Sequence, residues 1–161
     1  MLNAPELLKR LSQNKVEYVV IGGLAMITHG SAHITKDLDF CYRRTPENLT
    51  ALATAFGDLH PYLRGVPPGL PFRFDVATLR AGLNFTLDTD LGAVDIFGEV
   101  PGLGDFDAVA ARSTTLELFN TSVRVLSLEG LIAAKKAAGR IKDQLHLVEL
   151  EELSKLQSRD I

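Results

Sequence analysis

The sequence predicts an α/β fold, in which a mixed β-sheet is flanked by helices and followed by a short C-terminal helical extension. Short apolar runs with strand character alternate along the chain with runs whose apolar residues recur at helical spacing. In residues 19–41, VVIGGLAMITHGSAHITKDLDFC, a glycine pair ends one apolar strand and an Asp-x-Asp lies inside the next. Such alternation of strands and helices is typical of α/β domains.

The first part of the chain is expected to hold three helices and two strands. Leu7, Leu8 and Leu11 share one face of a predicted helix over residues 5–14. Thr45 is the expected cap of a helix that begins with Pro46. The predicted elements in order are a helix at 5–14, a strand at 16–21, a helix at 24–29, a strand at 38–42 and a helix at 46–56.

The remainder is expected to hold two strand pairs and two helices. Four prolines and two glycines predict a loop over residues 60–74. The later predictions are a hairpin at 84–88 and 92–97, a loop at 100–107, strands at 116–119 and 123–126, and helices from 128 to about 156 that break near Gly139. We expect one domain over residues 1–161, with a core of about 1–126 and C-terminal helices at about 127–157.

The composition is that of an ordinary globular protein. Its 161 residues are 46% hydrophobic and 23% charged, and the net charge of −3 provides no general attraction to nucleic acid. There is one cysteine, the N-terminal residues lack an apolar signal segment, and no apolar run approaches the ~20 residues that span a bilayer. We therefore expect a cytoplasmic protein without a membrane partner.

Three carboxylates are candidate metal ligands. Asp37 and Asp39 lie two residues apart on a strand and therefore point to the same face. Asp95 lies in GAVDIFG, on a strand expected to be a neighbour. Taken singly, an Asp-x-Asp can mark a solvated strand edge, and Asp95 can be a helix cap or an ion-pair partner. Together they would supply the oxygen ligands that Mg²⁺ prefers, in a site for two ions ~3.5–4 Å apart.

The glycine pair, Gly22 and Gly23, is a candidate phosphate-binding element. Glycine lets the backbone approach phosphate closely, and the N-terminus of the following helix favours negative charge. A phosphate cradle beside a divalent-cation site is suited to moving a nucleotidyl group.

Basic residues lie in two groups, Arg64, Arg73 and Arg80 beside the proline-rich loop, and Lys135, Lys136, Arg140 and Lys142 in the helical region. Both groups can be ordinary surface charge. The arginines could instead line an acceptor or base pocket. Lys135 shares a helical face with Leu131, so we expect it to point inward, and the lysine group could also meet an RNA acceptor.

These motifs together resemble the DNA polymerase β-type nucleotidyltransferase superfamily. Its pattern is an apolar residue, Gly-Gly or Gly-Ser, about a dozen residues, Asp-apolar-Asp-apolar, and a later carboxylate. Here the pattern reads Ile21-Gly22-Gly23, thirteen residues, Asp37-Leu38-Asp39-Phe40 and Asp95. GGLAMITHGSAHITKDLDF looks like the minimal nucleotidyltransferases of bacterial toxin–antitoxin and abortive-infection (AbiEii-like) systems. NFTLDTDLGAVDIFGEVPGLGDF and LEGLIAAKKAAGRIKD extend the likeness over most of the chain.

The resemblance implies a role for each matched residue. The implied catalytic and metal-binding residues are Asp37, Asp39 and Asp95, and the implied nucleotide-binding residues are Gly22, Gly23, Lys135 and Arg140. The implied activity is Mg²⁺-dependent transfer of a nucleoside monophosphate from an NTP such as ATP to a hydroxyl of RNA, tRNA or a cognate protein. Asp95 would help to activate that hydroxyl. The setting that the resemblance suggests is a toxin–antitoxin system.

Two positions depart from the pattern, and two other functions stay open. His33 stands where the group often has arginine, and His146 where it often has an acidic residue. One alternative is an antitoxin-like partner with little or no catalysis, although buried unpaired acids would be costly to retain for folding alone. The other is a transferase that modifies a small molecule such as an antibiotic. The short chain argues against a dedicated substrate domain of that kind.

Overall fold

The computed structural model describes residues 1–159, so the last two residues of the predicted domain lie outside the described part. Its main sheet has seven strands in the order β3-β4-β5-β2-β1-β9-β8. The strands are β1 (Tyr18–Ile21), β2 (Asp37–Tyr42), β3 (Tyr62–Leu63), β4 (Asn84–Thr89), β5 (Gly92–Phe97), β8 (Ser113–Leu118) and β9 (Thr121–Leu126). β2 runs parallel to β5 and β1 runs parallel to β9, whereas the other pairs are antiparallel. The predicted mixed sheet is confirmed.

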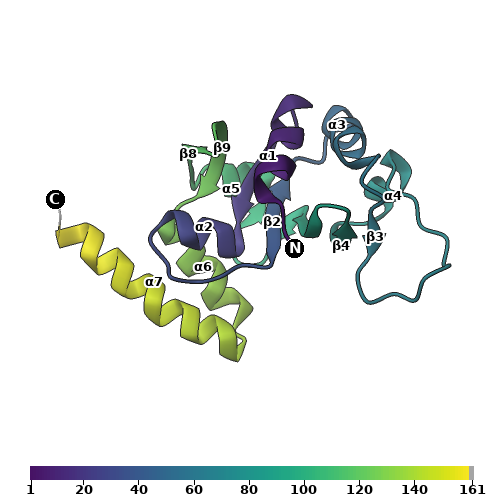
Figure 1. Ribbon diagram of the computed structural model, residues 1–161. Helices are drawn as coiled ribbons and strands as arrows, with labels where there is room; N and C mark the ends of the chain where they lie inside the picture. Colours follow the sequence, from purple (N-terminus) through teal and green to yellow (C-terminus); the bar gives the residue numbers. More distant parts are fainter. Residues whose placement is uncertain (160–161) are drawn as a thin grey trace.

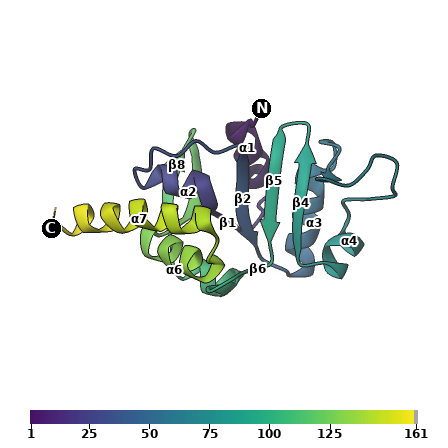
Figure 2. The same cartoon turned by 90° about the horizontal axis from the view of Figure 1, so that it is seen from below.

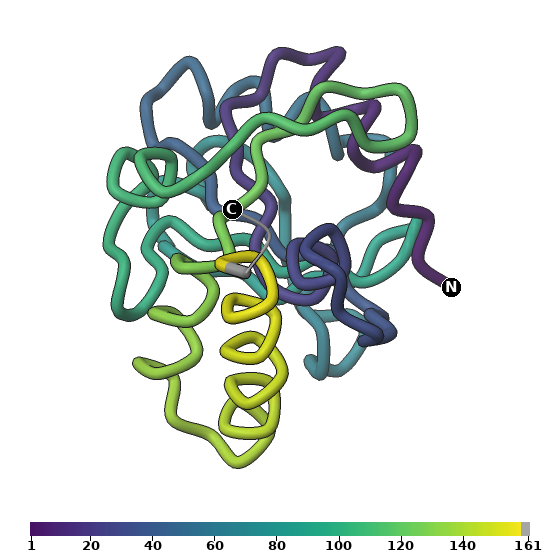
Figure 3. Tube along the Cα trace, turned by 90° about the vertical axis from the view of Figure 1, so that its left-hand side faces the viewer, coloured from purple at the N-terminus to yellow at the C-terminus, as the bar shows by residue number. Residues whose placement is uncertain are grey.

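Helices cover both faces of this sheet (Figures 1 and 2). Figure 2 shows α2 (Gly22–Thr28), α6 (Leu128–Ala138) and α7 (Ile141–Arg159) in front of the sheet, with α3 (Pro46–Phe56) behind it. α1 (Ala4–Gln13) packs against α3. α6 and α7 lie side by side and form the C-terminal helical hairpin (Figure 3). Within residues 1–159, no helix combines the length and apolar character needed to cross a membrane.

The core follows the apolar pattern of the sequence. Leu7, Leu8 and Leu11 on α1 are completely buried, as their helical spacing predicts. β1 is buried along its whole length because it lies between two strands and under helices. Thr45 caps α3 by accepting a hydrogen bond from the amide of Asn48 at 3.3 Å. Local signals therefore account for these elements.

Several boundaries differ from the sequence prediction. The predicted loop at 60–74 contains β3, a strand too short to show alternation, which pairs with β4. Four further elements were not predicted, α4 (Val76–Ala81), β6 (Glu99–Val100), β7 (Gly104–Asp105) and α5 (Phe106–Ala110). Asp75 and Asp105 cap α4 and α5 by accepting hydrogen bonds from Thr78 and Ala108, so a capping signal was present in both segments. β8 begins three residues earlier than predicted, and α2 begins at Gly22 rather than after the glycine pair.

Candidate active site

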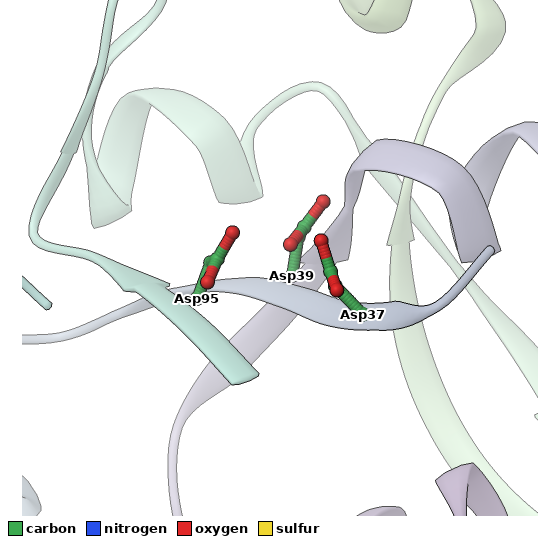
Figure 4. A group of neighbouring side chains, drawn as sticks. All are labelled: Asp37, Asp39 and Asp95. Carbon is green, nitrogen blue, oxygen red and sulfur yellow. The ribbon is translucent and has the colours of Figure 1, made fainter. Parts of the chain in front are cut away.

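The structure brings the three predicted carboxylates together on one face of the sheet. β2 and β5 are parallel neighbours, and their register places Asp39 directly opposite Asp95. Asp37 lies two residues earlier on β2 and therefore points the same way. One carboxylate oxygen from each residue lies within 4.8 Å of those of the other two. Figure 4 shows all three side chains on the same side of the two strands.

The surroundings of this triad suit a hard divalent cation. Burial, together with the nearby charges of Asp95 and Asp37, raises the pKa of Asp39 to about 7. Asp39 Oδ1 is buried without a hydrogen-bond partner among the described residues. Burial also raises the pKa of Asp95. Clustered carboxylate oxygens that repel one another, one of them buried without a proton donor, fit Mg²⁺, which is bound through carboxylate oxygens.

The glycine pair lets α2 approach β2 closely. Gly22 has a φ of +64°, and a Cβ atom there would lie 2.1 Å from Asp39 Oδ2. A Cβ atom on Gly23 would lie 2.7 Å from Thr35 Oγ1. That hydroxyl in turn donates a hydrogen bond to the carbonyl oxygen of Asp37 at 2.8 Å. The glycines therefore have a packing role at the triad that the sequence alone did not indicate: a side chain on Gly22 would displace the Asp39 carboxylate, and one on Gly23 would displace Thr35.

An ion-pair cluster around the buried carboxylate of Asp143 joins α6 and α7 beside the triad. Lys135 Nζ lies 3.1 Å from Asp143 Oδ1, and Arg140 Nε lies 2.6 Å from Asp143 Oδ2. Burial alone would raise the pKa of Asp143, but the hydrogen bonds from Arg140 and Lys135 outweigh it and lower the pKa to about 2. Lys135 is only 15% exposed and points inward, as its helical position predicts. Asp143 thus anchors both basic residues at the cavity.

A cavity of about 400 Å³ opens over the triad. Besides the three carboxylates, its lining includes Gly22, Gly23, His33, Thr35, Lys36, Lys135, Arg140, Lys142 and His146. The His33 and His146 rings meet edge to face with centroids 4.9 Å apart, so the two positions that depart from the family pattern lie in one wall. The cavity is therefore acidic at its floor and rich in basic groups around it, which suits a metal-bound polyphosphate.

Arg64 contacts the triad directly, a contact that the sequence did not predict. It follows β3 directly, and its Nη2 atom lies 2.9 Å from Asp95 Oδ1 while its Nε atom lies 3.1 Å from Asp88 Oδ1. Nη2 also donates a hydrogen bond to the carbonyl oxygen of Leu87 at 2.7 Å. No local motif signals this contact, because it depends on the pairing of β3 with β4 at the sheet edge.

We predict that replacing Arg64 by Gln lowers kcat about 10- to 100-fold, the range seen when groups that support metal ligands are removed. The guanidinium orients the Asp95 carboxylate and opposes the burial that raises its pKa. Steady-state kinetics at saturating Mg²⁺ measure the effect. Arg73→Gln is the matched control, because Arg73 is exposed in the same segment. Equal kcat values for both variants would contradict a positioning role for Arg64.

The fold that carries this site resembles those of several solved structures. No protein-family model matches the sequence, and no curated protein matches it either. Among solved structures, a lincosamide antibiotic adenylyltransferase, LnuA, with lincomycin bound, is 13% identical with a TM-score of 0.61. That match covers 94% of this chain and 98% of LnuA.

Two further structures resemble the chain. A candidate nucleotidyltransferase from Thermotoga maritima is 18% identical with a TM-score of 0.54, and the match covers 98% of this chain and 94% of that one. An antigenic nucleotidyltransferase-like protein from Paracoccidioides brasiliensis is 19% identical with a TM-score of 0.54, over 96% of this chain and 78% of that one. The chain therefore has the fold of the nucleotidyltransferases, with an acidic triad on its sheet.

Proposed function

We propose that the protein is a Mg²⁺-dependent nucleotidyltransferase that moves a nucleoside monophosphate from an NTP to a hydroxyl acceptor. The observation that carries this proposal is the convergence of Asp37, Asp39 and Asp95 beside the glycine pair, on a nucleotidyltransferase fold. These carboxylates would hold two Mg²⁺ ions. Bound Mg²⁺ would offset the charge of the triphosphate and stabilise the charge that develops during transfer.

The residues of the cavity then have separate tasks. The acceptor oxygen forms a bond to the α-phosphorus, the bond from that phosphorus to the bridging oxygen breaks, and pyrophosphate leaves with the electron pair. Asp95, whose pKa is raised by burial, would take the hydroxyl proton. Lys135 and Arg140 line the same cavity as Gly22 and Gly23, and together with the glycine backbone they would steady the departing phosphates.

Two classes of acceptor follow from different observations. The sequence resemblance favours RNA, tRNA or a cognate protein within a toxin–antitoxin system. The likeness to an antibiotic adenylyltransferase favours a small-molecule hydroxyl instead. The short length of the chain does not count against this acceptor, because the match covers 98% of LnuA, whose structure has lincomycin bound.

The decisive experiment incubates the pure protein with each NTP, Mg²⁺ and one acceptor pool at a time, followed by mass spectrometry. The pools are total tRNA, cell lysate and a set of hydroxyl-bearing antibiotics. We expect one acceptor to gain the mass of a single nucleoside monophosphate, with release of pyrophosphate. The same reaction with Asp39→Asn should leave the acceptor unchanged.

The outcome separates the remaining functions. Modified tRNA or protein supports the RNA or protein acceptor, and a modified antibiotic supports the small-molecule acceptor. A folded protein that binds Mg²⁺ and NTP but modifies nothing in any pool would contradict the transferase. It would favour the antitoxin-like binding partner.

A further inference from the structure

A second, mainly apolar chamber of about 300 Å³ lies beside the polar cavity. Its walls come from α6, from the ends of β1 and β9, and from the segment that follows β5. The apolar lining residues are Ile21, Phe97, Val100, Pro101, Leu126, Leu131, Ala134 and Ala138. This volume is at the lower end of the about 300–1,000 Å³ of pockets that hold small molecules.

The chamber exists because α6 presents small side chains toward it. Ala134 and Ala138 lie one turn apart, so the helix leaves space next to the strand ends. The opposite wall is formed by Val100 and Pro101, and the residue that follows them, Gly102, packs against α6. Gly102 has a φ of +83°, and a Cβ atom there would lie 2.5 Å from the Cβ atom of Ala137 on α6. The wall and the helix are thus packed directly against each other.

The chamber is continuous with the polar cavity. Gly22, Asp39, Phe97, Lys135 and Arg140 line both. A ligand whose phosphates lie in the polar cavity can therefore place an attached apolar group in the chamber. Asp95 and Arg64 are not part of the chamber lining, so the carboxylate assigned to the acceptor hydroxyl lies outside the chamber.

We propose that this chamber binds the nucleobase of the NTP. The inference rests on the proposed function and deepens it by assigning a site to the base. The polar lining groups, Asp39, Lys135, Arg140 and Asp143, are carboxylates and cations that face the phosphates or one another, which leaves apolar walls for the rest of the ligand. The base is thus held by contact area and by stacking on Phe97, rather than by hydrogen bonds to its edge.

The test compares two ligands that differ by the nucleoside. Binding of ATP and of inorganic tripolyphosphate is measured by calorimetry in Mg²⁺, for the wild type and for Ala134→Phe, which fills the chamber. We expect the variant to bind ATP at least about fivefold more weakly, the smallest loss expected for one stacked base. Its affinity for tripolyphosphate should stay within about twofold of the wild type.

Two further variants serve as a substitute for Ala134→Phe and as a control. Ala138→Phe fills the chamber from the exposed end of α6, so it serves if Ala134→Phe does not fold. Glu129→Phe is the matched control, because Glu129 is exposed on the same helix and lines neither the chamber nor the polar cavity. The control should bind both ligands as the wild type does.

The possible results separate this inference from the proposed function. A wild type that binds neither ATP nor tripolyphosphate overturns the proposed function, and this inference with it. A wild type that binds ATP, together with filled variants that bind ATP equally well or lose both ligands equally, overturns the nucleobase site alone. A filled variant that binds ATP normally but shows a raised KM for the acceptor also overturns it, because the acceptor then occupies the chamber.

Discussion

Replacement of Asp39 by Asn is expected to abolish nucleotidyl transfer and, without metal, to stabilise the folded protein above pH 7. Asp39 lies at the centre of the triad, opposite Asp95 and two residues from Asp37. Loss of one ligand of a two-metal site removes several kcal/mol of transition-state stabilisation, so activity should fall at least about a thousandfold. Asparagine keeps the size of the side chain and removes its charge.

The gain in stability follows from the pKa of this carboxyl. In the folded protein it is about 7, above the ordinary 3.8. Folding therefore favours the protonated form, and the free energy of unfolding of the wild type should fall as the pH rises from about 4 to about 7. The difference from Asp39→Asn should be absent below about pH 4 and reach at most about 4.5 kcal/mol above pH 7, at about 1.4 kcal/mol per pKa unit.

Urea unfolding at pH 4 and pH 8, with and without Mg²⁺, measures both effects. Mg²⁺ should stabilise the wild type and leave Asp39→Asn nearly unchanged, because the ligand binds only the folded state. Glu117→Gln is the control, since Glu117 is an exposed carboxylate on β8, far along the sheet from the triad. If the variant is less stable than the wild type at pH 8 without metal, the charged Asp39 carboxylate does not destabilise the folded protein, and this account is contradicted.

Replacement of Asp143 by Ala is expected to destabilise the protein by about 3–5 kcal/mol, the cost of removing one partner of a buried ion pair. Asp143 is fully buried and joins Lys135 on α6 to Arg140 at the start of α7. Without it, Lys135, whose side chain is only 15% exposed, keeps its charge and loses its hydrogen bond to a carboxylate. The KM for NTP should also rise, because Lys135 and Arg140 lose the group that fixes them at the cavity.

The pH dependence identifies this carboxylate. Its pKa is lowered to about 2, so its stabilising effect is complete above about pH 4 and is lost as the pH falls toward 2. The wild type and Asp143→Ala should therefore converge in stability at low pH, as urea titrations at several pH values would show. Glu151→Ala is the control, because its pair with Lys136 is exposed and should contribute at most about 1 kcal/mol. A constant difference between wild type and Asp143→Ala at all pH values would contradict this account.

Much of this protein is encoded in local patterns. The helical face of α1, the Thr45 cap of α3 and the glycine pair before the Asp-x-Asp strand can all be recognised along the chain. Period-2 alternation puts Asp37 and Asp39 on one face, and helical spacing turns Lys135 inward. These predictions depend only on neighbours within a turn or a strand, where side-chain direction follows from sequence spacing.

The tertiary structure decided the contacts that bridge separate elements. The parallel pairing of β2 with β5 puts Asp95 opposite Asp39, and the edge pairing of β3 brings Arg64 to Asp95. The folding of α7 back onto α6 buries Asp143 between Lys135 and Arg140, and the packing of Gly102 on α6 closes the apolar chamber. None of these follows from periodicity, because register and packing between distant segments depend on the whole sheet and its helices. The sequence by itself thus determines which carboxylates, glycines and basic residues the site contains. Their partners and the shape of the cavity are decided only by the tertiary structure.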